Sequence, residues 1–229
     1  MKNNITLRAQ QTLNVMGFDA GPNDGIFGRE TSKGVTAFQK AKKLRVTGTL
    51  DPETVAVLLG EEFDMPPWMI EIERVRGLHE VRHRSLLMRW LASDGATLGD
   101  PAKNPWCGDA VQTPLLLTLP NEPVPTNPYL AANWTKFGQP CTPQLGAVLV
   151  FWRGSPTSWK GHVTFYIGED ATHYICLGGN QSNMIRYSRI AKNRLRENGC
   201  RWPLSYSGPT GGPRFIANSK QYVETVNEA

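Results

Sequence analysis

The sequence predicts an α+β protein of two units, a small three-helix bundle and a larger unit whose helices pack on an antiparallel sheet. Residues 5–60 carry apolar residues at helical spacing, interrupted by glycine-rich turns. Further helical patterns follow, and then strand-like apolar runs from residue 147 to residue 189. Helices first and hairpin-linked strands afterwards are typical of the α+β class.

An acidic stretch with a proline pair separates the two units. Glutamates, an aspartate and the prolines at 66 and 67 interrupt the helical pattern, as in a linker. We therefore expect a first domain at residues 1–60, a linker at 61–67, a second domain at 68–205 and a tail at 206–229.

The charge balance favours an acidic partner. The 229 residues carry a formal net charge of +5, and nucleic acid, an anionic membrane and the anionic bacterial wall would all suit it. The dense basic cluster of Lys40, Lys42, Lys43 and Arg45 has no interleaved aromatic residues, which favours a solvated helix face over a nucleic-acid site. No apolar run is long enough to cross a bilayer. We expect a monomer without nucleic acid or stable membrane insertion.

The N-terminal residues and the cysteines bear on the compartment. Residues 1–12 are polar and lack the apolar core of a secretion signal, so we expect synthesis in a cytosol. The four cysteines, Cys107, Cys141, Cys176 and Cys200, are widely spaced, and no C-x-x-C pair occurs. Free thiols are the expectation, and we interpret the last three as small buried residues.

Three helices are predicted in the first unit. Ala9 and Leu13 share one face of a first helix, which Gly17 ends. Val35 and Phe38 mark the second. The third begins at 51–53, with aspartate as N-cap and proline at the first helical position.

The first unit also repeats a short pattern. Residues 25–31 align with residues 48–54, each with glycine, an apolar residue two positions later and then Glu-Thr entering a helix. This repeat suggests two related half-units on one core. The unit resembles the three-helix peptidoglycan-binding domain of many cell-wall hydrolases, which implies a wall-anchoring module with bacterial peptidoglycan as partner. The resemblance is carried by Gly17-Phe18, Asp24-Gly25-Ile26-Phe27-Gly28, Thr31, Phe38-Gln39 and Thr47-Gly48-Thr49-Leu50-Asp51.

The second unit should begin with helices and continue with strands. A helix that opens at Cys107 should kink or end at Pro114. After Pro203, the Ser-, Gly- and Pro-rich tail should pack little, and its end should be mobile. The other predicted helices span residues 68–76, 85–91 and 129–137, and the predicted strands span 147–152, 162–167, 173–177 and 184–189.

His79, Glu80 and His83 match the H-E-x-x-H signature of zinc metallopeptidases. On a helix, both histidines would share one face and hold zinc, with the glutamate as general base. Gly77 just upstream breaks a helix, and no third ligand stands at the usual spacing. Zinc peptidase chemistry therefore remains an alternative hypothesis.

A cysteine, a histidine and an asparagine form the leading candidate for a catalytic site. Cys107 follows a rigid Pro-Trp step at an expected helix start, His162 opens a strand, and Asn180 ends the next strand. A helix N-terminus and a neighbouring imidazole are two standard ways of lowering a thiol pKa. A third polar group then orients the ring.

The same residues resemble the CHAP superfamily of papain-like cysteine amidohydrolases and peptidases. The matching motifs are Pro105-Trp106-Cys107, the hairpin at 161–170 and Leu177-Gly178-Gly179-Asn180-Gln181-Ser182. The resemblance implies Cys107 as nucleophile, His162 as base and later acid, and Asn180 as the orienting residue, with His173 as an alternative. The Cys107 backbone N–H would help to stabilise the oxyanion. We interpret Trp106, Asp109, Trp159 and Gln181 as candidate substrate contacts.

Two departures from the superfamily matter. Gly108-Asp109 follows the nucleophile where small apolar residues are usual, so Asp109 could raise the thiol pKa or contact substrate. No clustered calcium loop occurs either, and we expect no cofactor and no metal.

Wall binding joined to a cysteine amidohydrolase resembles a bacteriophage endolysin. Such an enzyme would wait in the cytoplasm of the infected host until a membrane-permeabilising partner lets it reach the wall. It would cleave a wall amide through a thioacyl-enzyme, either at N-acetylmuramoyl-L-alanine or within the peptide. The alternative from another class is a non-catalytic wall-binding or phage structural protein.

Overall fold

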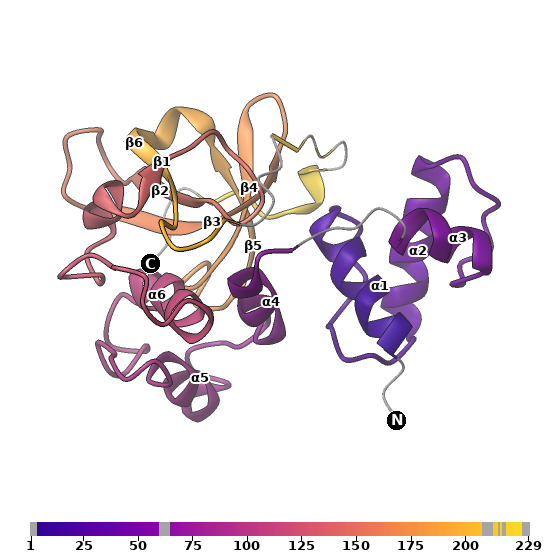
Figure 1. Ribbon diagram of the computed structural model, residues 1–229, viewed down its shortest axis with the longest axis horizontal. Coiled ribbons are helices and arrows are strands. Elements are labelled where there is room, and N and C mark those ends of the chain that lie inside the picture. The colour runs from indigo at the N-terminus through magenta and orange to yellow at the C-terminus, as the bar shows by residue number, and fades with distance from the viewer. Residues whose placement is uncertain (1–3, 60–64, 208–212, 215, 217–218, 226–229) are drawn as a thin grey trace. The chain divides into compact units, whose positions relative to one another are not determined.

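The computed structural model describes residues 4–59, 65–207, 213–214, 216 and 219–225 (Figure 1). The chain divides into two compact units, Met1–Asp64 and Met65–Ala229. Most of the predicted linker, residues 61–64, lies outside the described residues. None of the described helices combines the length and the apolar character that a membrane span requires.

The first unit consists of three helices around a small apolar core, as predicted. They are α1 (Asn4–Val15), α2 (Arg29–Ala41) and α3 (Pro52–Leu59). Gly17 follows α1 with a φ of 83°, a conformation that glycine adopts without strain. The Asp51 carboxylate accepts the Thr54 N–H at 2.8 Å, which confirms the predicted N-cap. The buried core residues are Ala9, Leu13, Ala20, Val35, Phe38 and Leu58.

Two buried glutamines explain the sequence repeat. The Gln10 side chain accepts the Gly25 N–H at 2.8 Å and donates to Thr31 Oγ1 at 3.0 Å. Gln39 makes the equivalent hydrogen bonds in the second copy of the repeat. It accepts the Gly48 N–H at 2.8 Å and donates to Thr54 Oγ1 at 2.8 Å. Each glutamine therefore ties one glycine turn to the helix that follows it.

Replacing Gln10 with leucine should destabilise the first unit by about 2–4 kcal/mol, because buried partners would lose their hydrogen bonds. Besides Gly25 and Thr31, these partners include the Ile26 carbonyl. Gln11→Leu, at the half-buried neighbouring position, serves as control with an expected change within about 0.5 kcal/mol. Amide hydrogen exchange of α1–α3 in the full chain measures both, and equal protection in the two variants would contradict the prediction.

One helix of the second unit continues past an internal proline. Pro114 lies inside α6, which runs on to Thr118 instead of ending at the proline. A proline removes one helical hydrogen bond, but residues 107–115 are all buried, so packing holds the helix together. The helices are α4 (Pro67–Arg74), α5 (Arg84–Leu91), α6 (Cys107–Thr118) and the short η1 (Ala131–Lys136), η2 (Lys192–Arg194) and η3 (Ser219–Gln221).

A six-stranded antiparallel sheet forms the rest of the second unit, in the order β1-β6-β2-β3-β4-β5. The four predicted strands are present, but β6 was not predicted. Its residues are largely polar, and polar and apolar residues do not alternate regularly along it. Its pairing with β2 also shifts register between Leu149 and Phe151. The strands are β1 (Gln139–Pro140), β2 (Val148–Trp152), β3 (Gly161–Glu169), β4 (His173–Gly178), β5 (Arg186–Ala191) and β6 (Leu195–Trp202).

The C-terminal segment packs more than its composition predicts, so the expectation of a loosely packed tail was wrong. Tyr206 lies edge-on against Trp68, with ring centroids 4.8 Å apart. Glu224 forms a parallel bridge with Arg189 of β5, and the Thr225 N–H donates to the Arg189 carbonyl. Backbone hydrogen bonds hold the segment, and these do not depend on apolar residues. The last residues, 226–229, lie outside the described residues.

Candidate active site

Cys107 is the first residue of α6, directly after the N-cap residue Trp106. Backbone N–H groups in the first turn of a helix have no intrahelical acceptor and favour negative charge nearby. The Trp106 indole N–H donates to a Glu80 carboxylate oxygen at 2.8 Å. The Glu80 N–H in turn donates to the Asn183 carbonyl at 2.9 Å. The residue before the cysteine is therefore held by Glu80, which is itself bonded to the segment after β4.

Two glycines allow the chain to pack closely around the cysteine. A Cβ on Gly108 would lie 2.0 Å from the Pro128 carbonyl oxygen. A Cβ on Gly179 would lie 2.4 Å from both the Trp106 ring and Ala110 Cβ. Neither site has room for a side chain, which brings the turn after β4 against the start of α6.

His162 lies next to Cys107, on strand β3, and its side chain is fully buried. Burial by itself raises the pKa of the Cys107 thiol. The hydrogen bond and charge of His162 outweigh it, with the backbone N–H groups of Val163 and Gly108 adding to the effect, so the pKa is lowered. A lowered pKa increases the fraction of nucleophilic thiolate. The cysteine–histidine pair predicted from the sequence is thus assembled in space.

Gln181 holds the far side of the imidazole ring. His162 Nε2 and Gln181 Oε1 lie 3.1 Å apart. An amide oxygen only accepts, so Nε2 carries the proton of the neutral ring and Nδ1 is left for the thiol. The Thr164 hydroxyl also donates to Gln181 Oε1 at 3.3 Å, and the Gln181 amide donates to the Arg186 carbonyl. The oxygen therefore cannot swap places with the amide nitrogen without losing these bonds.

The third position was predicted to be Asn180 or His173, but the oxygen beside His162 Nε2 belongs to Gln181. Asn180, one residue before Gln181, has a φ of 56°, a backbone conformation that asparagine tolerates. His173 begins β4 at the far end of the β3–β4 pair, beyond the Glu169–Tyr174 pairing. There its Nε2 lies 3.2 Å from a Glu224 oxygen. The sequence analysis counted Gln181 only as a substrate contact. His162 and Thr164 lie on the same face of β3, and both contact the Gln181 side-chain oxygen.

The candidate substrate contacts differ widely in exposure. Trp106, Asp109 and Gln181 are buried, with at most 1% of their surface exposed, which favours positioning roles over direct contact with a polymer. Trp159 is 69% exposed, with the Lys160 ammonium 5.9 Å from its ring centroid. Of the four, Trp159 alone offers a large surface to a ligand.

Asp109 is a carboxyl group buried in the first turn of α6, two residues after Cys107. Its Oδ2 accepts the Thr97 hydroxyl at 2.8 Å and the Leu98 N–H at 3.2 Å, while Oδ1 is buried and has no hydrogen-bond partner among the described residues. The pKa of Asp109 is raised to about 6. Burial is the main cause, the charge of Asp94 adds to it, and the two hydrogen bonds oppose it.

The free energy of unfolding should therefore fall as pH rises from about 4 to about 6, because the folded state binds a proton that the unfolded chain has released. We expect a loss of about 1–3 kcal/mol over this range. Asp109→Asn should remove most of this slope. Asp94→Asn should lower the folded pKa of Asp109, so the fall should end at a lower pH and its total should be smaller. Urea unfolding between pH 4 and pH 8 measures it, and an unchanged slope in Asp109→Asn would refute the assignment.

The H-E-x-x-H segment does not form the helix that its zinc interpretation requires. Residues 79–83 form a bridge and a turn, and α5 begins only at Arg84. Nδ1 of His83 accepts the His79 N–H at 3.1 Å, and Nδ1 of His79 accepts the Val81 N–H at 3.1 Å. Glu80 instead holds the Trp106 indole. Through this hydrogen bond, the segment helps to position Trp106, the residue before Cys107.

One cavity borders the start of α6. It measures about 460 Å3 and is lined by Leu98, Thr126, Asn127, Tyr129 and Leu130. Leu98 bonds to Asp109, and a Cβ on Gly108 would lie 3.1 Å from Tyr129 Cα. This cavity therefore adjoins the first turn of the nucleophile helix.

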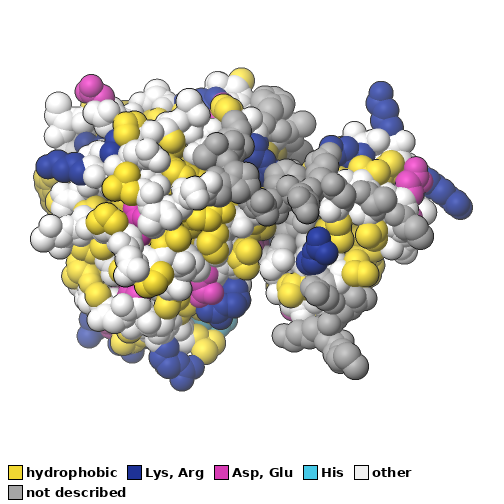
Figure 2. All heavy atoms as spheres, viewed as in Figure 1, with side chains coloured by type: hydrophobic (Ala, Val, Ile, Leu, Met, Phe, Trp, Pro, Cys, Tyr) yellow, Lys and Arg dark blue, Asp and Glu magenta, His cyan; other side chains and the backbone are white. Residues whose placement is uncertain are grey.

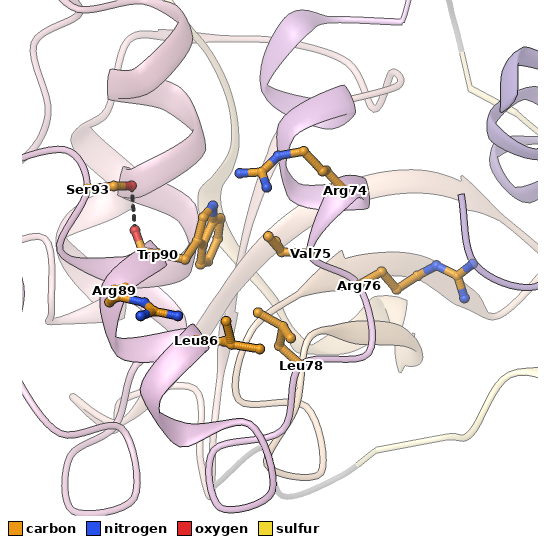
Figure 3. A pocket seen from close by; sticks show the side chains of 8 residues that line it. All are labelled: Arg74, Val75, Arg76, Leu78, Leu86, Arg89, Trp90 and Ser93. Carbon is orange, nitrogen blue, oxygen red and sulfur yellow. Dashed lines mark hydrogen bonds between the residues drawn. The ribbon is translucent and has the colours of Figure 1, made fainter. Parts of the chain in front are cut away.

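A second cavity of about 400 Å3 lies between α4 and α5, and its lining includes Arg74, Arg76, Arg89 and the Trp90 ring (Figure 3). Arg74 pairs with Glu71, and Arg76 pairs with Glu73, so two of its three guanidinium groups are already neutralised. Neither Cys107 nor His162 lines this cavity.

Comparison with known proteins identifies the first unit. Residues 3–58 match the family described as peptidoglycan binding domain. The first unit is a peptidoglycan-binding domain. Over 58 residues the chain is also 40% identical to the carboxy-terminal processing protease CtpB of Bacillus subtilis (strain 168).

These similarities cover a limited part of the chain. The CtpB match spans 25% of this chain and 12% of that protein, so it falls well short of the relative's length. No solved structure matches the chain. On the face visible in Figure 2, Lys and Arg side chains are scattered and form no continuous basic stripe.

Proposed function

We propose that the second unit hydrolyses an amide bond in the peptide part of peptidoglycan, as a CHAP-like cysteine amidohydrolase with a papain-like fold. The observation that carries the proposal is the Cys107–His162 pair, whose ring is oriented by Gln181. A helix-borne thiol, a strand-borne imidazole and an amide acceptor are the parts that acyl transfer through cysteine requires. The adjoining wall-binding domain supports peptidoglycan as the substrate.

The reaction begins when the Cys107 thiolate attacks the amide carbonyl carbon and a tetrahedral intermediate forms. The Cys107 backbone N–H, at the first helical position, stabilises the developing oxyanion. Protonated His162 gives its proton to the leaving amine, and the C–N bond breaks. His162 then takes a proton from water, whose hydroxide releases the acyl group from sulfur. Throughout, Gln181 keeps the proton on Nε2 and leaves Nδ1 for these transfers.

The cavity beside α6 is the candidate entrance for the peptide. Its lining combines apolar side chains with Thr126, Asn127 and the Tyr129 ring, a mixture that suits a short peptide. Cys107 itself is only 5% exposed, and the cavity adjoins the first turn of its helix, so we place the entry of the substrate carbonyl on this side. Trp159 adds an exposed aromatic surface at the loop before β3.

The wall-binding domain has a candidate contact face on α2. A cavity of about 490 Å3 runs along one side of this helix, where helical spacing aligns its lining residues. Arg29 and Lys40 give this face positive charge, which suits the carboxylates of wall peptides. The lining residues are Arg29, Ser32, Lys33, Thr36, Ala37 and Lys40.

Digestion of purified peptidoglycan tests the proposed reaction. Fragments released by the full-length chain are identified by mass spectrometry, with parallel samples pretreated with iodoacetamide or with a chelator. We expect release that alkylation abolishes and chelation leaves intact, and the fragment masses identify the bond. Release that survives alkylation would contradict the cysteine mechanism. No release from walls that the protein binds would favour a non-catalytic wall-binding or structural protein.

We also propose that the chain acts as a phage endolysin, which waits in the cytoplasm of the infected host before it reaches the wall. The combination of a wall-binding domain with a wall hydrolase supports this. When the chain is produced inside a bacterium with a susceptible wall, the cells should remain intact until a membrane-permeabilising agent is added. Lysis during synthesis, without that agent, would contradict this proposal.

A further inference from the structure

We propose that Cys141 and Cys200 form a modification site, an intramolecular disulfide produced by exchange with a small-molecule disulfide. Their sulfur atoms lie 3.5 Å apart, although 59 residues separate them in the sequence. The Cys141 N–H donates to the Cys200 carbonyl at 3.2 Å. The pair is separate from the Cys107–His162 pair, and the inference does not depend on the proposed hydrolase activity.

The strand register brings these cysteines face to face. Gln139 pairs with Trp202, and Pro140 pairs with Arg201, so the next step along both chains sets Cys141 opposite Cys200. Directly opposed residues of antiparallel strands have Cα atoms about 4.5–5.5 Å apart, within the roughly 4.4–6.8 Å that disulfides span. Rotation of the two side chains is therefore enough to close the bond.

Access favours this pair over the other thiols, and acidity favours Cys141 as the first of the two to react. Cys141 and Cys200 are partly exposed, whereas Cys107 and Cys176 are buried. A hydrogen bond from the Cys200 thiol lowers the pKa of Cys141. Burial opposes this effect, and the Arg201 charge adds to it. Cys141 is thus the thiol that reacts first, with Cys200 in place to resolve the product.

The exchange balances without any further reactant. The Cys141 thiolate attacks one sulfur of the small disulfide, breaks its S–S bond and releases one small thiolate. The Cys200 thiolate then attacks the Cys141 sulfur of this mixed disulfide and releases the second small thiolate. Two protein thiols are oxidised, one small disulfide is reduced to two thiols, and the two protein protons end on those thiols.

The crosslink would connect the end of β1 to its neighbour β6 at one edge of the sheet (Figure 1). The chain segment between the two cysteines contains β2–β5, including His162 on β3. Closing a loop of this length restricts the unfolded chain, so the unfolding temperature of the second unit should rise by roughly 10 °C. A reducing compartment would keep the dithiol, and an oxidising one would keep the crosslink. The bond therefore stabilises the unit where reductant is scarce.

Peptide mapping of the full-length chain tests the proposal. The reduced protein is incubated with oxidised glutathione, denatured in excess iodoacetamide and digested without reductant. We expect an intact mass lower by two hydrogens, one peptide that joins Cys141 to Cys200, and alkylation at Cys107 and Cys176 only. Thermal unfolding of the folded, oxidised protein, taken before denaturation, should show the upward shift relative to the reduced protein, and Cys200→Ser treated in the same way should lack it.

Three outcomes would overturn the proposal. Alkylation at all four cysteines would show that the pair does not exchange. Stable glutathione adducts at Cys141 or Cys200 would show that the resolving step fails. A crosslink that includes Cys107 or Cys176 would show a different pairing. All three are measured on the unaltered sequence, so the test stands even where the serine variant fails to fold.

Discussion

Replacing Cys107 with alanine should lower the rate of peptidoglycan hydrolysis by roughly 10^4-fold or more, because no other group can form the acyl-enzyme. Binding to intact walls should be unchanged, since the peptidoglycan-binding domain occupies residues 3–58. Fragment release measured by mass spectrometry and co-sedimentation with walls follow the two properties separately. A variant that binds walls without cleaving them is the expected result.

Cys176→Ala is the matched control for this substitution. Cys176 is also a buried thiol, on β4, but it has no part in the proposed chemistry. This variant should keep activity within a few-fold of the parent. Equal hydrolysis by Cys107→Ala and the unaltered chain would eliminate the cysteine mechanism and direct attention to another site.

Replacing Gln181 with leucine should lower kcat by roughly 10^2- to 10^4-fold, the range expected when the group that orients a catalytic histidine is removed. The substitution keeps approximate volume but deletes the oxygen that accepts from His162 and Thr164. Without that acceptor, the imidazolium loses stabilisation, and the pKa of Cys107 should move up towards that of an isolated thiol. Alkylation rates of Cys107 across pH provide a readout that general loss of stability would not reproduce.

Asn180→Gly separates the two neighbouring amides. Glycine adopts the φ of 56° found at this position without strain, so the variant removes the side chain and keeps the backbone. We expect nearly unchanged kcat and an unchanged alkylation profile. The reverse pattern, with Asn180→Gly inactive and Gln181→Leu active, would return the orienting role to Asn180.

The order of elements followed from local sequence patterns. Period-3.6 apolar spacing and capping residues located the helices of the first unit, a near-continuous apolar run located β2, and alternation located β3. The repeat at 25–31 and 48–54 was also visible, because each copy carries its own glycine and threonine. These features depend on near neighbours in the chain, which the sequence displays directly.

Local signals missed two features of the second unit, because packing overrode those signals. The helix α6 continues through Pro114 since its surroundings bury the whole segment, and β6 forms although its polar residues do not alternate. Tertiary contacts of this kind routinely outweigh intrinsic preferences. No window of the sequence contains them.

The candidate site divides in the same way. Residue chemistry and motif order were enough to single out Cys107 and His162, since a thiol at a helix start and a histidine on a strand are recognisable locally. Only the folded chain decided which amide reaches the imidazole, because one residue along a turn changes the direction of a side chain completely. Likewise, only the strand register brought Cys141 to Cys200, across a separation that sequence patterns cannot measure.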